Sequence, residues 1–344
     1  MIHFLAAVAA TAGFLFGYDE GVIAVAGPLL EADFPMSPGL RGFMTACVPL
    51  GALAAATVAG PIADRLGRRR ALMAAAALFV AGALVAGAIT AIWMLIAARL
   101  ALGVAIGVAA VAAPLYIAET APVARRGAMV STYQLAITIG ILVSYLTGLA
   151  ITAPGAWRTM FGLGAVPGLL FLAGLAVLPE SPRWLARRGD LDAARQSLRR
   201  LRPAAADVDG EIDEVVRTAE AERGQPVGYA ALFAPAVRPA LVVAVGLFFL
   251  QQLSGINAVI YYAPEIFSHA GFDSDSTRLL ATVGIGAVNC ATTVAGMLLI
   301  DRLGRRPLLV LGFAGTAVTL LAIALAVTLP GLVPSWLVIV LLLL

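Results

Sequence analysis

The stretch Gly13-Phe14-Leu15-Phe16-Gly17-Tyr18-Asp19-Glu20-Gly21-Val22-Ile23 decides the fold class, because it places two adjacent carboxylates inside a run that is otherwise apolar enough to cross a membrane. A carboxylate near the middle of a bilayer costs on the order of a few kcal/mol, so it usually faces a charged partner or a water-filled path. Arg99 is the candidate partner of Asp19, since it is likewise enclosed in an apolar run, Ile92 to Leu102. We therefore predict a functional pair of charges inside a membrane protein.

Composition supports this class. Hydrophobic residues make up 61% of the chain and charged residues only 12%, and the mean hydropathy is +0.96, far from the balance of a soluble domain. The basic residues are all arginines and lie between apolar runs, which argues against a nucleic-acid partner. Two cysteines and two histidines leave no disulfide framework or metal site. No hydrolase, zinc-protease or phosphate-binding motif is present, so we expect neither an enzyme nor a bound cofactor.

Apolar runs of about 20 residues recur along the chain, as membrane-spanning helices require. Six come first, and three more follow a polar stretch, with a tenth beginning near Val333. The expected spans are 5–28, 41–62, 71–90, 92–117, 129–151, 158–178, 238–262, 279–300 and 308–329. The sequence thus predicts an all-α membrane protein with an N-terminal six-helix bundle over 1–179, a cytoplasmic linker with short helices over 180–236, and a partial second bundle over 237–344.

Arginine placement predicts the orientation. The loops after the second, fourth, sixth and eighth spans hold most of the arginines, whereas the opposite loops hold only Arg41, Arg158 and Arg278. Basic residues near span ends stay in the cytoplasm. We expect a multi-pass protein of the cell membrane with a cytoplasmic N-terminus.

The polar stretch has its own helical pattern. Apolar residues recur at helical spacing from Leu191 to Leu201, with Asp190 as a plausible N-cap, and Asp209 to Glu222 has the pattern of an acidic amphipathic helix. Both segments have apolar faces that must be buried, so we favour a packed cytoplasmic gate. A solvated linker is the alternative.

An internal repeat relates the two halves. Asp64-Arg65-Leu66-Gly67-Arg68-Arg69 follows the second span, and Asp301-Arg302-Leu303-Gly304-Arg305-Arg306 follows the eighth. Such repeats are typical of transporters in which two bundles rock about a central site. Six spans in each half would make twelve, and this chain supplies nine and a fraction.

With these motifs the chain resembles the sugar porter family of the major facilitator superfamily. The Asp-Arg-Leu-Gly-Arg-Arg loops indicate only the superfamily. The Pro-Glu-Ser-Pro-Arg stretch that begins at Pro179 and the Gln-Gln…Gly-Ile-Asn stretch that begins at Gln251 are much more specific, because both occur in their expected order. The stretches that carry the resemblance are Gly13 to Ile23, the two loops, Arg99 to Gly107 leading to Pro114-Leu115-Tyr116-Ile117-Ala118-Glu119, Pro179-Glu180-Ser181-Pro182-Arg183-Trp184, and Gln251-Gln252-Leu253-Ser254-Gly255-Ile256-Asn257 with Tyr261-Tyr262-Ala263-Pro264.

The resemblance implies a sugar pocket lined by amides inside the spans. An amide both donates and accepts hydrogen bonds without adding charge, which suits a polyhydroxylated ring. Phe16 would offer an apolar face to the sugar. Structural contacts between helices are the alternative role for single amides in a membrane. The implied substrate-binding residues are Phe16, Gln134, Gln251, Gln252, Asn257, Tyr261 and Asn289.

Proton coupling is implied for Asp19 and Arg99, because proton-coupled members of the family carry an aspartate and an arginine at these positions. Attraction between the charges favours an ionised Asp19, whereas poor solvation favours its protonated form, so the balance changes as a cavity opens to either side. Facilitators of the family generally have a neutral residue in place of Asp19. A static ion pair between helices is the alternative. We assign no role to Glu20, which points about 100° away around the helix.

A second set of charges resembles the cytoplasmic gate of the family, in which ion pairs close the inner side. An exposed basic loop would explain the arginines but not the acids. The implied gate residues are Asp64, Arg68, Glu119, Arg125, Glu180, Arg183, Asp301 and Arg305.

The chain departs from the family in its second half, where a Gly-Pro-x-x-Trp element, the last two spans and a C-terminal motif are expected and do not occur. We interpret the protein as an importer of a monosaccharide or polyol by proton symport. The alternatives are a facilitative uniporter and a truncated membrane protein or sensor that transports nothing. The proton is the expected coupling ion, and the identity of the sugar is left open.

Overall fold

The structure is a computed structural model, and it describes residues 2–122, 126–203, 207–221, 229–269 and 274–328. These residues form helices and the turns between them, with no strand in the described ranges. Nine helices or helix pairs in them are long and apolar enough to cross a membrane. The all-α prediction is therefore confirmed. The tenth expected span, near Val333, lies outside the described residues.

The first bundle holds the six apolar segments expected before residue 179. Its helices are α1 (Ile2–Asp33), α2 (Pro38–Leu66), α3 (Arg68–Ala88), α4 (Ile92–Thr120), α5 (Arg126–Ala150), α6 (Trp157–Leu163) and α7 (Ala165–Val177). The sixth expected span is two helices, because the chain turns at Gly164 between α6 and α7.

Glycines set the distance between α1 and α5. A β-carbon on Gly13 or Gly17 would collide with the backbone of Tyr133 or Ile137 on α5, so only glycine permits this approach. In α4, Gly103 and Gly107 lie against the backbone of α2 in the same way, as small residues allow between membrane helices. These contacts fix Asp19 and Arg99 in a rigid frame.

Three short helices follow the first bundle: α8 (Pro182–Arg187), α9 (Leu191–Leu201) and α10 (Val208–Ala221). The side chain of Asp190 accepts a hydrogen bond of 3.1 Å from the backbone N–H of Ala193, so the expected N-cap is confirmed. Ala194, Leu198 and Ile212 form a small buried core between α9 and α10. The apolar faces are therefore buried, as the packed interpretation required.

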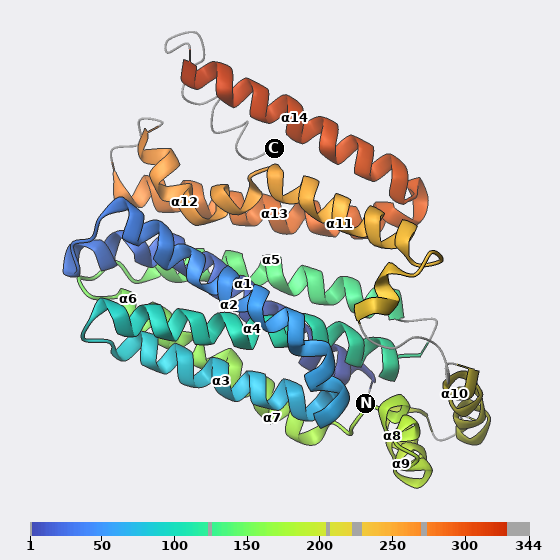
Figure 1. Cartoon of the computed structure of the whole chain (residues 1–344). Coiled ribbons are helices and arrows are strands. Elements are labelled where there is room, and N and C mark those ends of the chain that lie inside the picture. The colour runs from blue at the N-terminus through green and yellow to red at the C-terminus, as the bar shows by residue number, and fades with distance from the viewer. Residues whose placement is uncertain (1, 123–125, 204–206, 222–228, 270–273, 329–344) are drawn as a thin grey trace.

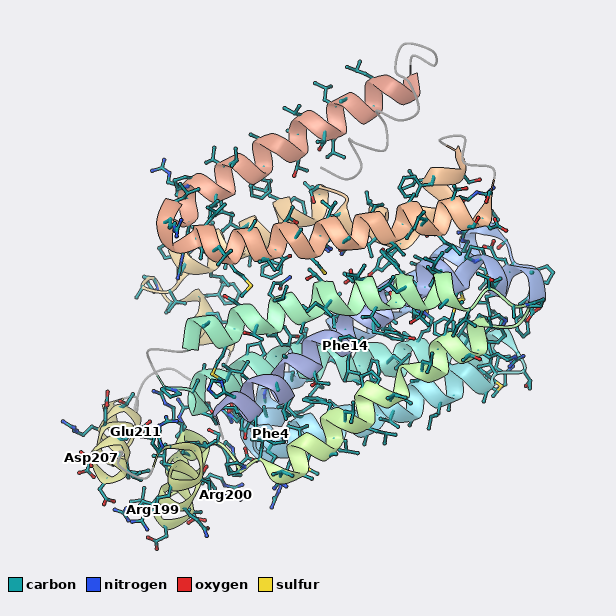
Figure 2. The ribbon with its side chains drawn as sticks, turned by 180° about the vertical axis from the view of Figure 1, so that it is seen from behind. Phe4, Phe14, Arg199, Arg200, Asp207 and Glu211 are labelled. Atoms are coloured by element: carbon teal, nitrogen blue, oxygen red, sulfur yellow. The ribbon has the colours of Figure 1, made fainter. Side chains whose placement is uncertain are left out.

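Figure 2 shows Arg199 and Arg200 on α9 and Asp207 and Glu211 by α10, in a group that extends beyond the end of the bundle. Arg202 joins this group to α4, because its guanidinium contacts the Glu211 carboxylate at 2.5 Å and the carbonyl of Thr120 at 2.8 Å. We call this the arginine-rich end of the molecule, since the arginines of the loop between α2 and α3 also lie there. We call the end of the bundle away from it the opposite end.

The second half contains η2 (Tyr229–Phe233), α11 (Arg238–Leu253), α12 (Ile256–His269), α13 (Asp275–Leu303) and α14 (Arg305–Thr328). α11 and α12 make one span, broken at Gly255, whose φ is 73°. The backbone is non-helical again at Tyr262. The expected span ended at 262, but the helix continues to His269, because hydropathy detects the apolar run and not the helix end.

The second half packs along one side of the first bundle. α12 lies against α1, and α13 lies against α5. α14 is the farthest from the first bundle (Figure 1). The contact between the halves therefore runs along α1 and α5, next to the residues expected to form the site.

Candidate functional site

Asp19 and Arg99 meet inside the first bundle, as predicted. The Arg99 Nη1 atom lies 3.9 Å from the Asp19 Oδ1 atom, and both side chains are at least 96% buried. The Arg99 Nε–H donates a 3.0 Å hydrogen bond to the carbonyl of Met44, and its guanidinium lies 5.9 Å from the ring centroid of Phe161. α1, α2, α4 and α6 thus converge on this pair.

The pair is held loosely. A direct charge-assisted hydrogen bond would be about 2.7–2.9 Å long, well below the observed 3.9 Å. Asp19 Oδ2 and Arg99 Nη1 are both buried with no hydrogen-bond partner. A buried polar atom without a partner costs about 1–3 kcal/mol, more for a charged group. The arrangement therefore suits a change in the protonation of Asp19 or in the partner of Arg99.

The expected sugar-binding amides lie on four helices, of which α5, α12 and α13 take part in the contact between the halves. Gln134 is on α5, Gln251 and Gln252 end α11, Asn257 begins α12, and Asn289 is in the middle of α13. Gln251 and Gln252 are exposed, and Gln252 lines a hollow of about 400 Å³ on α11. No hydrogen bond joins two of these side chains, and in the part of the chain that the structure describes none of them bonds to the protein. The structure therefore does not join the amides into one cluster.

The break at Gly255 separates the amides of α11 from Asn257 on α12. A helix that is interrupted in mid-membrane leaves backbone groups near a cavity, and transporters place substrate sites at such interruptions. Phe16 and Tyr261 are both partly buried and pack against the main core. Tyr261 belongs to α12, so it adds a hydroxyl on the same side of the break as Asn257.

The expected gate residues Asp64, Arg68 and Glu119 form one network at the arginine-rich end. The Arg68 Nη1 atom lies 2.8 Å from the Asp64 carboxylate, and Nη2 lies 2.9 Å from the Glu119 carboxylate. Ser181 donates a hydrogen bond to the other Glu119 oxygen. Arg68 is only 1% exposed. The network joins α2, α3, α4 and the start of α8.

Glu180 extends this network. One oxygen of its carboxylate accepts hydrogen bonds of 2.9 Å from the backbone N–H groups of Arg69 and Ser181. The Glu180 side chain also lies where a β-carbon of Gly67 would be, and Gly67 has a φ of 94°. Glycine is therefore required at Gly67 both by its backbone conformation and by the contact.

The remaining expected gate residues do not join the network. Arg183 is partly buried and makes no ion pair among the described contacts, and Arg305 is exposed at the start of α14. Arg125 lies outside the described residues, and Asp301 lies in α13 with its side chain outside them. In the described part of the chain, the network therefore lies within the first bundle and α8, with no residue of the second half.

Two sets of contacts at the interface between the halves escaped the sequence analysis. At the opposite end, Arg41 lies 3.0 Å from the Glu31 carboxylate and 2.7 Å from that of Glu265 on α12. Deeper in the bundle, the buried Glu20 interacts with Tyr261 on α12. The one feature of the sequence that could have indicated these contacts is the charge of Glu20 in the middle of a span. Arg41 lies at the edge of an expected span, where an arginine is ordinary.

The sequence profile of a family described as "Sugar (and other) transporter" matches residues 5–344. A putative metabolite transport protein, YwtG of Bacillus subtilis, is 42% identical over 316 residues, which are 92% of this chain and 68% of that protein. The galactose-proton symporter of Escherichia coli is 40% identical over 91% of this chain and 67% of its own length.

Among solved structures, the chain is similar to the xylose transporter XylE from E. coli in a partially occluded inward open conformation. The TM-score is 0.84 at 29% identity, with 99% of this chain and 80% of that chain covered. The profile, the relatives and the arrangement of the helices agree with one another. The chain therefore belongs to the sugar transporter family of the major facilitator superfamily, a family of multi-pass membrane transporters and not of enzymes.

Proposed function

We propose that the protein is a secondary active transporter that imports a monosaccharide or polyol together with a proton. The observation that carries the proposal is the buried, loosely held pair of Asp19 and Arg99. The symporter relative and the family support transport of a sugar. The proton is the coupling ion, and no metal or other cofactor is needed.

Proton coupling follows from the charges. When Asp19 is ionised, its attraction to Arg99 holds α1 to α4, and protonation of Asp19 weakens that attraction. The cost of a charge in the apolar interior couples the proton to the solvation of the site. Opening the site to one side or the other therefore changes whether Asp19 holds a proton.

Sugar binding is proposed for the amides, together with Phe16 and Tyr261. The described amides make no hydrogen bond within the protein, so their donors and acceptors are free to meet hydroxyl groups. Amides that only linked helices would instead bond across them. The break at Gly255 adds backbone groups at the same place.

The orientation that we propose places the arginine-rich end in the cytoplasm. The network of Arg68 and Glu180 fastens the inner ends of α2, α3 and α4 to α8, so the first bundle rocks as one unit. We assign Asp64, Arg68, Glu119 and Glu180 to the inner gate. Arg183, Asp301, Arg305 and Arg125 belong to the same proposal through the repeated motifs.

The test is Asp19→Asn in the natural protein, expressed in cells that lack their own sugar importers. The variant keeps exchange of D-galactose or D-xylose across the membrane but loses accumulation against a gradient, because the amide cannot carry the proton. Asp192→Asn is the matched control, since its carboxylate is exposed on α9. Undiminished accumulation in Asp19→Asn would show that this carboxylate does not couple the proton. Uptake that never exceeds equilibrium in the wild type would indicate a facilitator.

A further inference from the structure

Glu20 is a buried carboxylate that the mechanism above does not use. Asp19 and Glu20 are the acidic residues in the middle of a membrane-spanning helix, since the other acids of the described spans lie near helix ends. Asp19 faces Arg99 on α4, whereas Glu20, which is 7% exposed, interacts with Tyr261 on α12. Glu20 therefore lies on the side of α1 that meets the second half.

A cavity of about 380 Å³ lies above Glu20 at the outer end. Its walls come from the outer ends of α1, α2, α5 and α12 and the start of α13, and they include the pair of Arg41 and Glu265. Its volume holds several water molecules. The cavity is thus a route by which a proton could approach from outside.

Two helices place polar groups near this cavity. Ala24 on α1 and Gly148 on α5 line it, and they lie four residues after Glu20 and three residues after Tyr145. Residues three or four apart lie on the same face of a helix, about one turn from each other. Glu20 and Tyr145 therefore lie about one turn from the cavity wall, closer to the middle of the membrane.

The surroundings of Glu20 suit proton transfer. From α5, the Tyr145 hydroxyl donates a 2.9 Å hydrogen bond to the carbonyl of Ile260 on α12, so it is committed elsewhere. From α12, Tyr261 interacts with Glu20. On α1 the neighbouring charge is Asp19, which interacts electrostatically with Glu20 and in turn with Arg99. Glu20 is thus adjacent to Asp19 in the chain and about one helical turn from the cavity wall.

We propose that Glu20, lying between the outer cavity and Asp19, relays the proton from one to the other. The Glu20 carboxylate takes a proton from a hydronium ion in the cavity, which leaves water and a neutral carboxylic acid. It then gives that proton to the Asp19 carboxylate, so Glu20 becomes a carboxylate again and Asp19 becomes neutral. One proton moves inward and nothing is oxidised or reduced. The relay rests on the proton symport proposed above.

The experiment compares two rates in liposomes that contain the natural protein, with D-galactose and D-xylose as probes. The first is sugar exchange without a proton gradient, and the second is uptake driven by a proton gradient, followed with a pH-sensitive dye. Glu20→Gln raises the ratio of exchange to proton-driven uptake about tenfold, because only the second rate needs the relay. Glu20→Asp keeps a carboxylate and restores most of the driven uptake.

Tyr145→Phe is the matched control, because it removes the hydrogen bond from α5 to the carbonyl of Ile260 on α12 and leaves the Glu20 carboxylate. A change that only loosens the packing of α12 would lower both rates together, so the ratio in Tyr145→Phe stays within about twofold of the wild type. If Tyr145→Phe raises the ratio as much as Glu20→Gln, the packing and not the proton transfer is responsible, and the relay is wrong.

Two further outcomes separate the relay from the symport itself. If the wild type takes up protons with sugar and Glu20→Gln has the wild-type ratio, the relay is wrong and the symport stands. If sugar moves in the wild type without protons, the symport is wrong and the relay falls with it. Should Glu20→Gln not fold, Glu20→Met removes the carboxylate at similar length, and the same ratios decide.

Discussion

Arg68 shows how one residue organises the arginine-rich end. Its buried guanidinium is shared between the Asp64 and Glu119 carboxylates and the carbonyl of Ala63, which lies 3.0 Å away. Removing one partner of a buried ion pair leaves the other charge uncompensated, which costs far more than the pair contributes. The stability of this end therefore depends on Arg68 more than on its exposed neighbours.

Arg68→Met tests that dependence. The change leaves Glu119 buried without its cation, so we expect a loss of about 3 kcal/mol or more and a melting temperature in detergent that is lower by roughly 5 °C. Arg70→Met is the control, because Arg70 is exposed on the same helix. Equal melting temperatures for the two variants would show that the network does not stabilise the fold.

At this scale the sequence predicted part of the site. It predicted the meeting of Asp19 and Arg99, because each is a charge enclosed in an apolar run and a buried charge needs a partner. The contact of Arg41 with Glu265 could not be predicted, since both residues sit near span ends where charges are ordinary. Pairing between such residues depends on how the halves pack, which local patterns do not determine.

Among the elements, α1 and α5 form the tightest described contact. Gly13, Gly17 and Gly21 on α1 face Tyr133, Ile137 and Ser144 on α5 with no room for a side chain. Such contacts hold membrane helices together by van der Waals packing, because lipid provides no hydrophobic drive between them. The position of Asp19 follows from this contact, since it lies between Gly17 and Gly21.

Gly17→Val should separate α1 from α5, because the new side chain would meet the backbone of Ile137. Overpacking of this kind typically costs about 1–3 kcal/mol, and a collision with backbone falls at the high end. We expect a clearly lower yield of folded protein by size-exclusion chromatography. Gly27→Ala is the control, because a β-carbon there meets open space. A full yield of Gly17→Val would contradict the close contact.

The elements themselves were largely predictable. Apolar runs gave the spans of the first bundle, and Asp190 gave the start of α9, since both depend on local sequence. The interruption at Gly255 was not predicted, because the long run around it is apolar enough on average to read as one continuous span. The grouping of the amides into a pocket also stays a prediction, since it depends on how four helices are arranged in three dimensions.

At the scale of the whole molecule, Arg41 links the two halves at the opposite end, the one away from the arginine-rich end. It contacts Glu31 within the first bundle and Glu265 in the second half, and its guanidinium lies 5.5 Å from the ring centroid of Tyr262. These side chains are partly exposed, and exposed pairs contribute about 0.2–1 kcal/mol. A link of that size can bias the closing of the opposite end without preventing its opening.

Arg41→Gln should therefore open the opposite end more often. Val25 lines the cavity at that end and is buried, so Val25→Cys reports on opening when Cys47 and Cys290 are replaced by alanine. We expect labelling by a membrane-impermeant maleimide to rise about two- to fivefold, as a bias below 1 kcal/mol allows. Arg217→Gln on α10 is the control. Unchanged labelling would mean that Arg41 does not hold the halves together.

The break at Gly255, just before α12, and the non-helical backbone at Tyr262 within α12 have a mechanical consequence. α1 is held against α5 through its glycines, whereas the span made of α11 and α12 has two non-helical points about two turns apart. When the two halves move against each other, α12 therefore bends more readily than α1. We expect the strain of each transport cycle to concentrate in α12, so the segment that carries Asn257 and Tyr261 is also the one that flexes.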